Sequence, residues 1–180
     1  MLMDEQRLIV RILEGHAEDY GYFLERYGGE VFAIVSRLVP NREDAEELTQ
    51  DAFVRAYSRL DSFIGRSSFS TWVCRIAYTV AVSWLRKKRI KYLSIDDHPH
   101  ASDAEVDEVL DDESRLDELR HAISLLRPDE QMLLELYYFE SRPLADIAYI
   151  LDVEPGTIAT RLHRIRRKLY SLMKHGKANK

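Results

Sequence analysis

The stretch PGTIATRLHRIRRKL, residues 155–169, decides the fold of the C-terminal part of this chain. At about 100° per residue, four of its apolar residues fall within roughly 60° of one another: Ile158, Leu162, Ile165 and Leu169. Pro155 suits the first position of a helix, where no amide donor is needed. The stretch therefore predicts an amphipathic helix that packs through a narrow apolar stripe and carries basic residues on its other side.

The segment just before this helix supplies a partner for the stripe. Residues 143–151 predict a helix starting at Pro143, with an apolar face formed by Leu144, Ile147, Ala148 and Leu151. Asp152-Val153-Glu154 is a short turn, and Asp tolerates a left-handed backbone better than most residues other than glycine. Two helices joined in this way cross steeply, as in a helix-turn-helix. The alternative, a solvated basic helix, explains neither the turn nor the small Ala148 at the crossing.

Length and composition narrow the class of protein. With 180 residues and 46% hydrophobic content, the chain has room for one ordinary domain or two small ones. It has neither a long apolar run nor the pattern of a signal peptide, so we expect a cytoplasmic protein without a membrane span. The single cysteine, Cys74, excludes an intramolecular disulfide, and its apolar helical surroundings indicate a buried thiol.

Charge is distributed unevenly along the chain, although the net charge is only −5. Residues 1–93 hold 14 basic and 13 acidic residues, residues 94–118 hold one basic and 11 acidic, and residues 119–180 hold 11 basic and 7 acidic. An acidic stretch with few large apolar residues is typical of a flexible connector. We therefore expect an all-α protein: two small helical domains, 1–93 and 113–180, joined by a flexible acidic linker over 94–112, with the helix-turn-helix in the second.

The first domain is predicted to be helical throughout, because it has no convincing alternating strand pattern. Gly28-Gly29 predicts the end of one helix. Asn41, with Asp44 three residues on, predicts the capped start of a long helix. The inner face of that helix is apolar and comprises Ala45, Leu48, Ala52, Phe53, Ala56 and Leu60. Taken alone, the outer face indicates a solvated acidic surface, with Glu43, Glu46, Glu47, Gln50, Asp51 and Arg55.

Residues 63–72, FIGRSSFSTW, interleave small hydroxyl residues with aromatic residues and one arginine. Such a loop can hold an unstacked nucleotide, because hydroxyls hydrogen-bond to base edges while aromatic rings and arginine stack on them. The local sequence indicates equally well a capped turn whose Phe69 and Trp72 enter the core. The next helix ends in Arg86-Lys87-Lys88-Arg89, with Lys91 just beyond, which favours a phosphate contact over simple compensation of the helix dipole.

Four motifs succeed one another along nearly the whole chain. They are residues 44–57 (DAEELTQDAFVRAY), the loop through Thr71-Trp72, the helix from Arg75 to Arg89, and Gly156-Thr157-Ile158 with Arg161-Leu162-His163-Arg164. In order and spacing they resemble the small bacterial sigma factors of the extracytoplasmic-function (ECF) group, in the sigma-70 family. The resemblance implies a non-enzymatic, dissociable subunit of RNA polymerase that recognises the −35 and −10 promoter elements and promotes promoter opening. Its two helical domains are called regions 2 and 4.

The resemblance also assigns residues to three sites. The helix over 44–57 would dock on the clamp coiled coil of the largest polymerase subunit through Asp44, Glu47, Gln50, Asp51, Phe53 and Arg55. The −10 element would be captured, and its opening supported, by Arg66, Ser67, Ser68, Phe69, Trp72, Thr79, Ser83, Arg86 and Lys87. The −35 element would be read in the major groove by Gly156, Thr157, Thr160, Arg161, His163, Arg164, Arg167 and Lys168. The acidic linker would thread through polymerase channels that normally hold nucleic acid.

The sequence departs from the family pattern at several positions. Thr79 and Ser83 stand where relatives often carry Asn and Asp or Asn, Ala159 replaces a commonly basic residue, and Glu154 replaces a common Ser. The promoter sequence is therefore not predicted. The expected partners are core RNA polymerase, promoter DNA and an anti-sigma factor. No small-molecule substrate, cofactor or metal is expected.

Two other classes of protein remain as alternatives. A helical DNA-processing enzyme needs clustered carboxylates or a nucleophile with its base, whereas the carboxylates here lie on outer helix faces or in the connector. His98 and His100 offer two metal ligands without further ordered ligands nearby, which favours a solvated loop. The stronger alternative is a two-domain helix-turn-helix repressor that is not a polymerase subunit. It needs a ligand pocket or a dimer surface, and nothing in the first domain indicates either.

Overall fold

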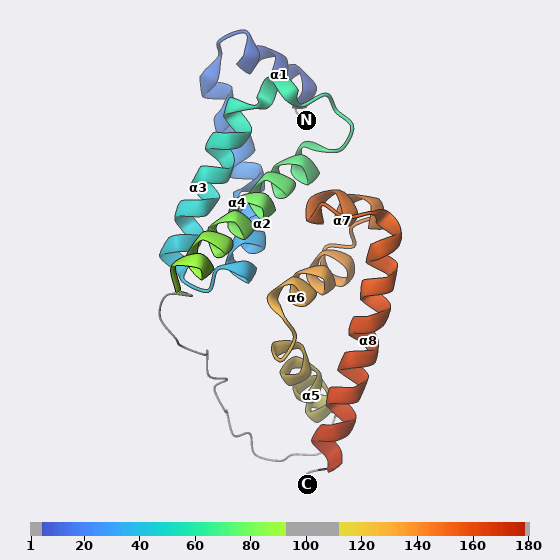
Figure 1. Ribbon diagram of the computed structural model, residues 1–180. Coiled ribbons are helices and arrows are strands. Elements are labelled where there is room, and N and C mark those ends of the chain that lie inside the picture. Colours follow the sequence, from blue (N-terminus) through green and yellow to red (C-terminus); the bar gives the residue numbers. More distant parts are fainter. Residues whose placement is uncertain (1–4, 93–111, 179–180) are drawn as a thin grey trace.

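The structure is a computed structural model that describes residues 5–92 and 112–178 (Figure 1). The N-terminal group of helices comprises α1 (Glu5–Leu13), α2 (Gly21–Leu38), α3 (Arg42–Ser58) and α4 (Phe69–Tyr92), with 3₁₀ turns at Ala17–Tyr20 and Leu60–Ser62. The C-terminal group comprises α5 (Asp112–Ser124), α6 (Pro128–Leu134), a π-helical turn at Glu135–Phe139, α7 (Leu144–Leu151) and α8 (Pro155–Ala178). Neither described range contains a strand, so the all-α prediction is confirmed.

The predicted linker falls almost entirely outside the described residues. Asp112, its last residue, is the first residue of α5, whereas His98 and His100 belong to the part that is not described. The side chains of Arg89 and Lys91, at the end of α4, are also outside the description. Over 5–92 and 112–178, no helix combines the length and the apolar character needed to cross a membrane.

Helices α2, α3 and α4 pack pairwise and enclose the core of the N-terminal group. The start of α3 is capped as predicted, because the backbone N–H of Asp44 donates to Asn41 Oδ1 at 2.8 Å. All six residues predicted for the inner face are buried: Ala45, Leu48, Ala52, Phe53 and Ala56 on α3, and Leu60 in the 3₁₀ turn that follows it. The spacing of apolar residues in the sequence is therefore sufficient to predict which face of α3 is buried.

Helix α2 runs straight through Gly28-Gly29, so the predicted helix end at this pair is wrong. Glycine inside a helix costs about 1 kcal/mol relative to alanine. The apolar stripe of α2 nevertheless continues on both sides of the pair, through buried residues at helical spacing: Phe23, Val31, Ile34, Val35 and Leu38. Burying this stripe offsets the cost of the two glycines, so tertiary packing overrides the local helix-stop signal.

An aromatic cluster fixes the start of α4 against α2. The ring centroids of Phe23 and Phe69 lie 4.1 Å apart, and those of Phe63 and Trp72 lie 5.1 Å apart. Ser68 caps the helix, because its Oγ accepts the backbone N–H of Thr71 at 3.1 Å. The capped-turn interpretation of this loop is therefore what the structure contains, with Phe69 and Trp72 both buried.

The helix-turn-helix is formed by α7 and α8. Asp152 follows α7 in a left-handed conformation, with φ 55° and ψ 49°, and Pro155 is the first residue of α8 as predicted. Pro143 precedes the first residue of α7 and acts as its N-cap. The predicted stripe of α8 is packed inward, with Ile158, Leu162 and Ile165 buried. The left-handed residue makes the steep crossing possible within a turn of three residues.

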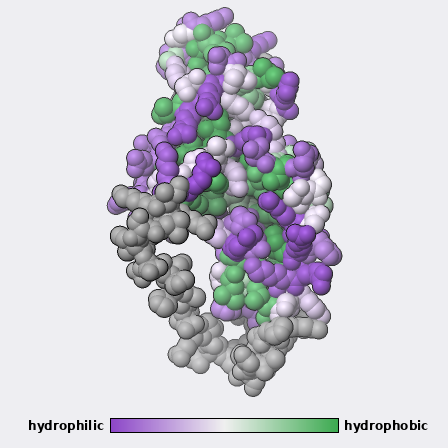
Figure 2. Space-filling model, viewed as in Figure 1, coloured by the Kyte–Doolittle hydropathy of each residue, from purple (hydrophilic) through white to green (hydrophobic). Residues whose placement is uncertain are grey.

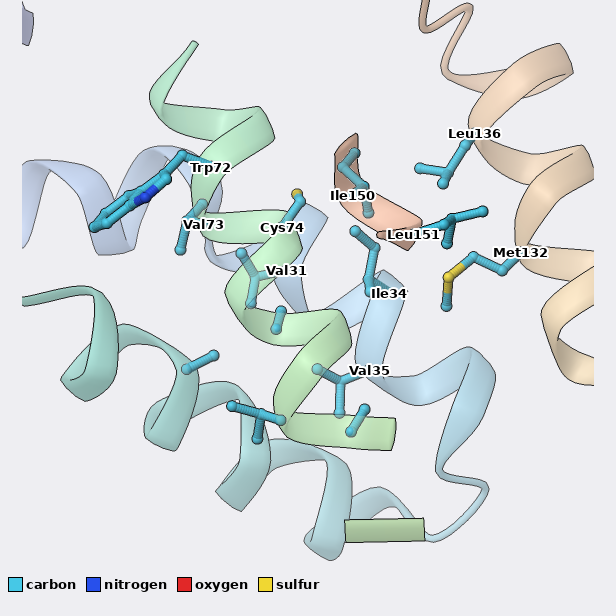
Figure 3. Packing of buried hydrophobic residues seen from close by; sticks show 14 of the residues in the cluster. Val31, Ile34, Val35, Trp72, Val73, Cys74, Met132, Leu136, Ile150 and Leu151 are labelled. Atoms are coloured by element: carbon cyan, nitrogen blue, oxygen red, sulfur yellow. The ribbon is translucent and has the colours of Figure 1, made fainter. Parts of the chain in front are cut away.

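The two groups of helices lie against each other. Helix α4 packs on α7, and α2 packs on α6 (Figure 1). Figure 3 shows Ile34 of α2 reaching toward Met132, Ile150 and Leu151 of the C-terminal group, all of which are buried. The apolar core is thus continuous across both groups.

Cys74 provides a test of this packing. Burial raises the pKa of its thiol to about 12, and only the thiolate reacts rapidly with disulfide reagents. We expect Cys74 in the folded protein at pH 8 to react more than about 100-fold more slowly than in denatured protein, as measured by absorbance with an aromatic disulfide reagent. Rapid reaction of the folded protein would show that α4 is not covered at this position.

Candidate nucleic-acid interface

Helix α8 presents a polar and basic face to solvent. Its apolar stripe is packed inward, which turns Thr160, His163, Arg164 and Arg167 outward. Hydrophilic residues dominate the surface over this helix in Figure 2. Gly156 in the first turn is exposed and Thr157 is half-buried. Most of the residues predicted for the −35 element therefore share one accessible face.

Acidic residues of α6 occupy the edge of this face. Lys168 Nζ lies 2.8 Å from Glu130 Oε2. Burial raises the pKa of Glu130, but the hydrogen bonds from Lys168 and from the backbone of Arg127 outweigh it, and the net shift is downward. Arg161 and Arg164 share a cleft of about 280 Å³ with Glu130. The predicted phosphate contact of Lys168 therefore competes with an ion pair inside the protein.

The residues predicted for the −10 element fall into two sets. Arg66 and Ser68 are exposed and Ser67 is half-buried, so these three are accessible. Phe69 and Trp72 are only 2% and 9% exposed, because they fill the aromatic cluster between α2 and α4. In this conformation neither ring offers a free face to a base. A role for the two rings in base capture stays a prediction that requires the loop to rearrange.

Further along α4, Thr79, Arg86 and Lys87 are exposed and Ser83 is half-buried. The Thr79 hydroxyl donates to the backbone oxygen of Arg75 at 2.8 Å, which leaves its lone pairs for another donor. Lys88 lies over the ring of Trp84, 4.3 Å from the centroid, and 3.4 Å from Asp44 Oδ2. Lys88, at the basic end of α4, is thus paired with a carboxylate at the start of α3.

The outer face of α3 is accessible along its length. Five of its polar residues are exposed on one side, Glu46, Glu47, Gln50, Asp51 and Arg55, and Glu43 joins them in the first turn. Arg42 Nε pairs with Glu46 Oε1 at 2.8 Å. The predicted polymerase-contacting residues Glu47, Gln50, Asp51 and Arg55 therefore face outward, whereas Asp44 is half-buried and Phe53 is buried.

An apolar groove of about 610 Å³ lies between α2 and α3, beside this acidic face. Gln50 and Phe53 line it, together with side chains that remain exposed: Leu24, Val54 and Tyr57. The Tyr20 hydroxyl donates to the backbone oxygen of Phe53 at 2.8 Å, which fixes the floor of the groove. The groove and the acidic face together make a surface suited to an amphipathic helical partner.

Arg75 of α4 binds the helix-turn-helix directly. Its guanidinium donates to the backbone oxygen of Tyr149 at 3.0 Å and to Asp152 Oδ1 at 2.6 Å, and it stacks over the Tyr149 ring at 4.5 Å. The cation thus meets the C-terminal end of α7, where the helix dipole favours positive charge. The residue that makes the turn toward α8 is therefore attached to the first domain.

Arg142 forms a second polar contact between the domains. Its side chain is 9% exposed, pairs with Glu30 of α2 and with Glu140 at 2.6 Å, and donates to Ser70 Oγ at 3.1 Å. Thr71, which is buried, donates to Asp146 Oδ2 of α7 at 3.2 Å. Burial lowers the pKa of Arg142 and raises that of Glu140, because both groups have lost water. The ion pairs and hydrogen bonds of Arg142 take the place of that water.

Sequence reasoning missed Glu30, Arg75 and Arg142 as contact residues. Each is a single charged residue on a helix or turn, and no spacing rule connects residues so far apart in the chain. Among the residues that the structure describes, no three His, Cys, Asp or Glu side chains gather in the manner of a metal site.

Both groups of helices match known sequence families. Residues 23–90 match the family model of Sigma-70 region 2, and residues 116–169 match that of Sigma-70, region 4. The ECF RNA polymerase sigma factor SigW of Bacillus subtilis (strain 168) is 29% identical over an alignment of 180 residues. This alignment covers 94% of this chain and 96% of SigW. The ECF RNA polymerase sigma-E factor of Escherichia coli (strain K12) is 30% identical over an alignment of 178 residues, which covers 93% of this chain and 93% of that protein.

Two solved structures share the fold. The sigma factor RpoE in complex with the anti-sigma factor NepR, from Bartonella quintana, aligns with a TM-score of 0.65 at 24% identity, over 87% of this chain and 98% of that one. CnrH in complex with the cytosolic domain of CnrY aligns with a TM-score of 0.64 at 19% identity, over 93% and 96%. Because two successive regions match and the relatives align over nearly their whole length, this chain belongs to the ECF RNA polymerase sigma factors of the sigma-70 family.

Proposed function

We propose that this sigma factor binds core RNA polymerase, reads the −35 element with α8 and the −10 element with residues around the start of α4, and promotes promoter opening. One observation carries the proposal. A single chain combines a helix-turn-helix with an outward basic face and, on α3, an exposed acidic face beside an apolar groove. A repressor needs the first of these surfaces but has no use for the second. The protein is accordingly an initiation subunit without catalysis of its own, acting in the cytoplasm where polymerase and promoter DNA meet.

The polymerase contact is assigned to the acidic face of α3 and the groove beside it. Charged residues on the rim of an interface steer association, while apolar side chains at its centre provide most of the affinity. Glu47, Gln50, Asp51 and Arg55 are the rim, and Phe53 with Val54 and Tyr57 form the apolar centre. An amphipathic helix of the polymerase clamp is the partner that this arrangement fits.

An anti-sigma factor is the third proposed partner. The RpoE and CnrH structures are both complexes; one contains the anti-sigma factor NepR and the other the cytosolic domain of CnrY. The groove between α2 and α3 leaves Leu24, Val54 and Tyr57 exposed, and such apolar surface is unusual on a protein without partners. A protein that covers it would keep the polymerase away.

Transcription with purified components tests the function. We expect the chain, added to core polymerase and a library of promoter variants, to yield full-length transcripts from a subset defined at both the −35 and −10 positions. Core polymerase alone should yield none. A repressor would give no transcripts with core polymerase and would instead reduce those made by a complete holoenzyme.

Val54 provides the sharpest test of the polymerase contact, because it is 67% exposed on α3 without a role in the core. Val54→Asp places a charge in the apolar centre of the contact, and we expect it to weaken binding to core polymerase about tenfold or more. Val10→Asp, at a valine 53% exposed on α1, is the matched control and should leave the affinity unchanged. Equal affinities for all three proteins, measured by fluorescence anisotropy, would remove α3 from the interface.

Substitutions at Arg164 and Arg167 can distinguish a residue of α8 that reads a base from one that contacts the phosphate backbone. Arg164 lies near the N-terminal half of the helix, where an arginine can pair bidentately with guanine for about 1–3 kcal/mol of discrimination. Arg164→Ala should relax the preference at one −35 position. Arg167→Ala should weaken every sequence alike and reduce the salt slope by about one. Transcription from a −35 library at two salt concentrations measures both. A uniform loss in Arg164→Ala would identify Arg164 as a phosphate contact.

A further inference from the structure

The loop between α3 and α4, residues 63–68, projects from the helices at the end of the molecule where α1 lies (Figure 1). Its Ile64 side chain is 68% exposed. A single exposed apolar residue is ordinary on a protein surface, so its meaning depends on what surrounds it. Here the surroundings are the part of the chain assigned to the −10 element.

The loop is fixed at both of its ends. At the first end, the half-buried Phe63 packs on Trp72, with 5.1 Å between the ring centroids. At the other end, Ser68 Oγ accepts the backbone N–H of Thr71 at 3.1 Å and lies 2.8 Å from Thr71 Oγ1. Because both ends are held, the residues between them form a short, supported projection rather than a free loop.

Three kinds of side chain follow one another on this projection. Gly65 has φ 71°, a left-handed conformation that turns the backbone and that other residues adopt with strain. Ile64 precedes it and Arg66 follows it, and both are exposed. Ser67 comes next and is half-buried. The projection therefore offers an apolar group, a cation and a hydroxyl within four residues.

Opening a duplex requires that neighbouring bases be unstacked. Proteins that unstack DNA insert an apolar side chain, such as isoleucine, between two base pairs. Phe69 and Trp72 are poorly placed for this, because they are 2% and 9% exposed and leaving the core would sacrifice their burial. Within residues 63–72, Ile64 is the large apolar side chain that is mostly exposed, so it can enter a base step without disturbing the core.

We propose that Ile64 is the wedge that separates the first bases of the −10 element. Arg66 binds a phosphate beside the opened step, and the hydroxyls of Ser67 and Ser68 meet the base that leaves the stack. Phe63 holds the wedge in place through the aromatic cluster. The proposal rests on the proposed function, because it presupposes that this chain opens a promoter.

Three substitutions isolate the contribution of the apolar side chain. Ile64→Ser removes it and leaves the cation and the backbone turn in place. Ile64→Leu keeps an apolar side chain of the same size. Leu13→Ser is the matched control, because Leu13 is an apolar residue of α1 that is also exposed, at 53%, and has no part in the proposed contacts. Since neither residue belongs to the core, all three variants should unfold at the temperature of the parent.

Opening is measured with core polymerase on a promoter that carries the fluorescent base 2-aminopurine in its −10 element. We expect Ile64→Ser to open the duplex about tenfold more slowly than the parent, because the inserted side chain no longer stabilises the unstacked step. Ile64→Leu and Leu13→Ser should open it at the rate of the parent. An unchanged rate in Ile64→Ser, or an equal loss in Ile64→Leu, would overturn the proposal.

A second template separates a wedge from a residue that binds or reads DNA. Its −10 element is mismatched and therefore already unpaired, so no base step has to be opened. We expect all four proteins to transcribe it equally. A loss in Ile64→Ser on this template as large as on the duplex would show that Ile64 acts in binding, and the proposal would fail. If the parent transcribes neither template, the proposed function itself fails.

Discussion

Helix α4 must satisfy two packing partners at once, and the rest of the structure depends on that constraint. One side closes the core of the first domain through Val73, Ala77 and Val80, all of them buried. The other side receives α7 through Arg75 and the hydroxyl of Thr71. Because interiors are close-packed, a helix held on both sides cannot shift toward one partner without opening a gap at the other. The orientation of region 4 is therefore linked to the core of region 2.

Helical periodicity predicted most of the fold because it reports burial directly. The inner face of α3 and the stripe of α8 follow from spacing alone, whereas the cap at Asn41 and the left-handed turn at Asp152 follow from the local preferences of those residue types. The failure at Gly28-Gly29 has a clear physical cause. A local preference of about 1 kcal/mol per glycine competed with an apolar stripe extending over both halves of α2, and the stripe prevailed.

The candidate site was predicted only where its residues share a helical face. Thr160, His163, Arg164 and Arg167 share such a face, and the structure leaves them exposed. The loop before α4 was ambiguous because its local sequence fits both a nucleotide pocket and a capped turn. In the structure its Phe69 packs inward against Phe23, which lies on another helix. Ser70 and Arg142 are 72 residues apart, and no periodic signal in the sequence connects them.

The π-helical turn at Glu135–Phe139 has a consequence for the evolution of this chain. Its backbone closes with the N–H of Glu140 donating to the oxygen of Glu135, five residues back, so it holds one residue more than an α-helical turn. One π-helical turn takes one residue more than one α-helical turn, so loss of one codon here would restore ordinary winding and leave the residues after the turn in nearly the same orientation. Arg142, three residues beyond the turn, would then keep its place beside Glu30. Insertions and deletions of one residue are thus more easily accepted at this turn than within α7 or α8, where each would rotate the rest of the helix by about 100°.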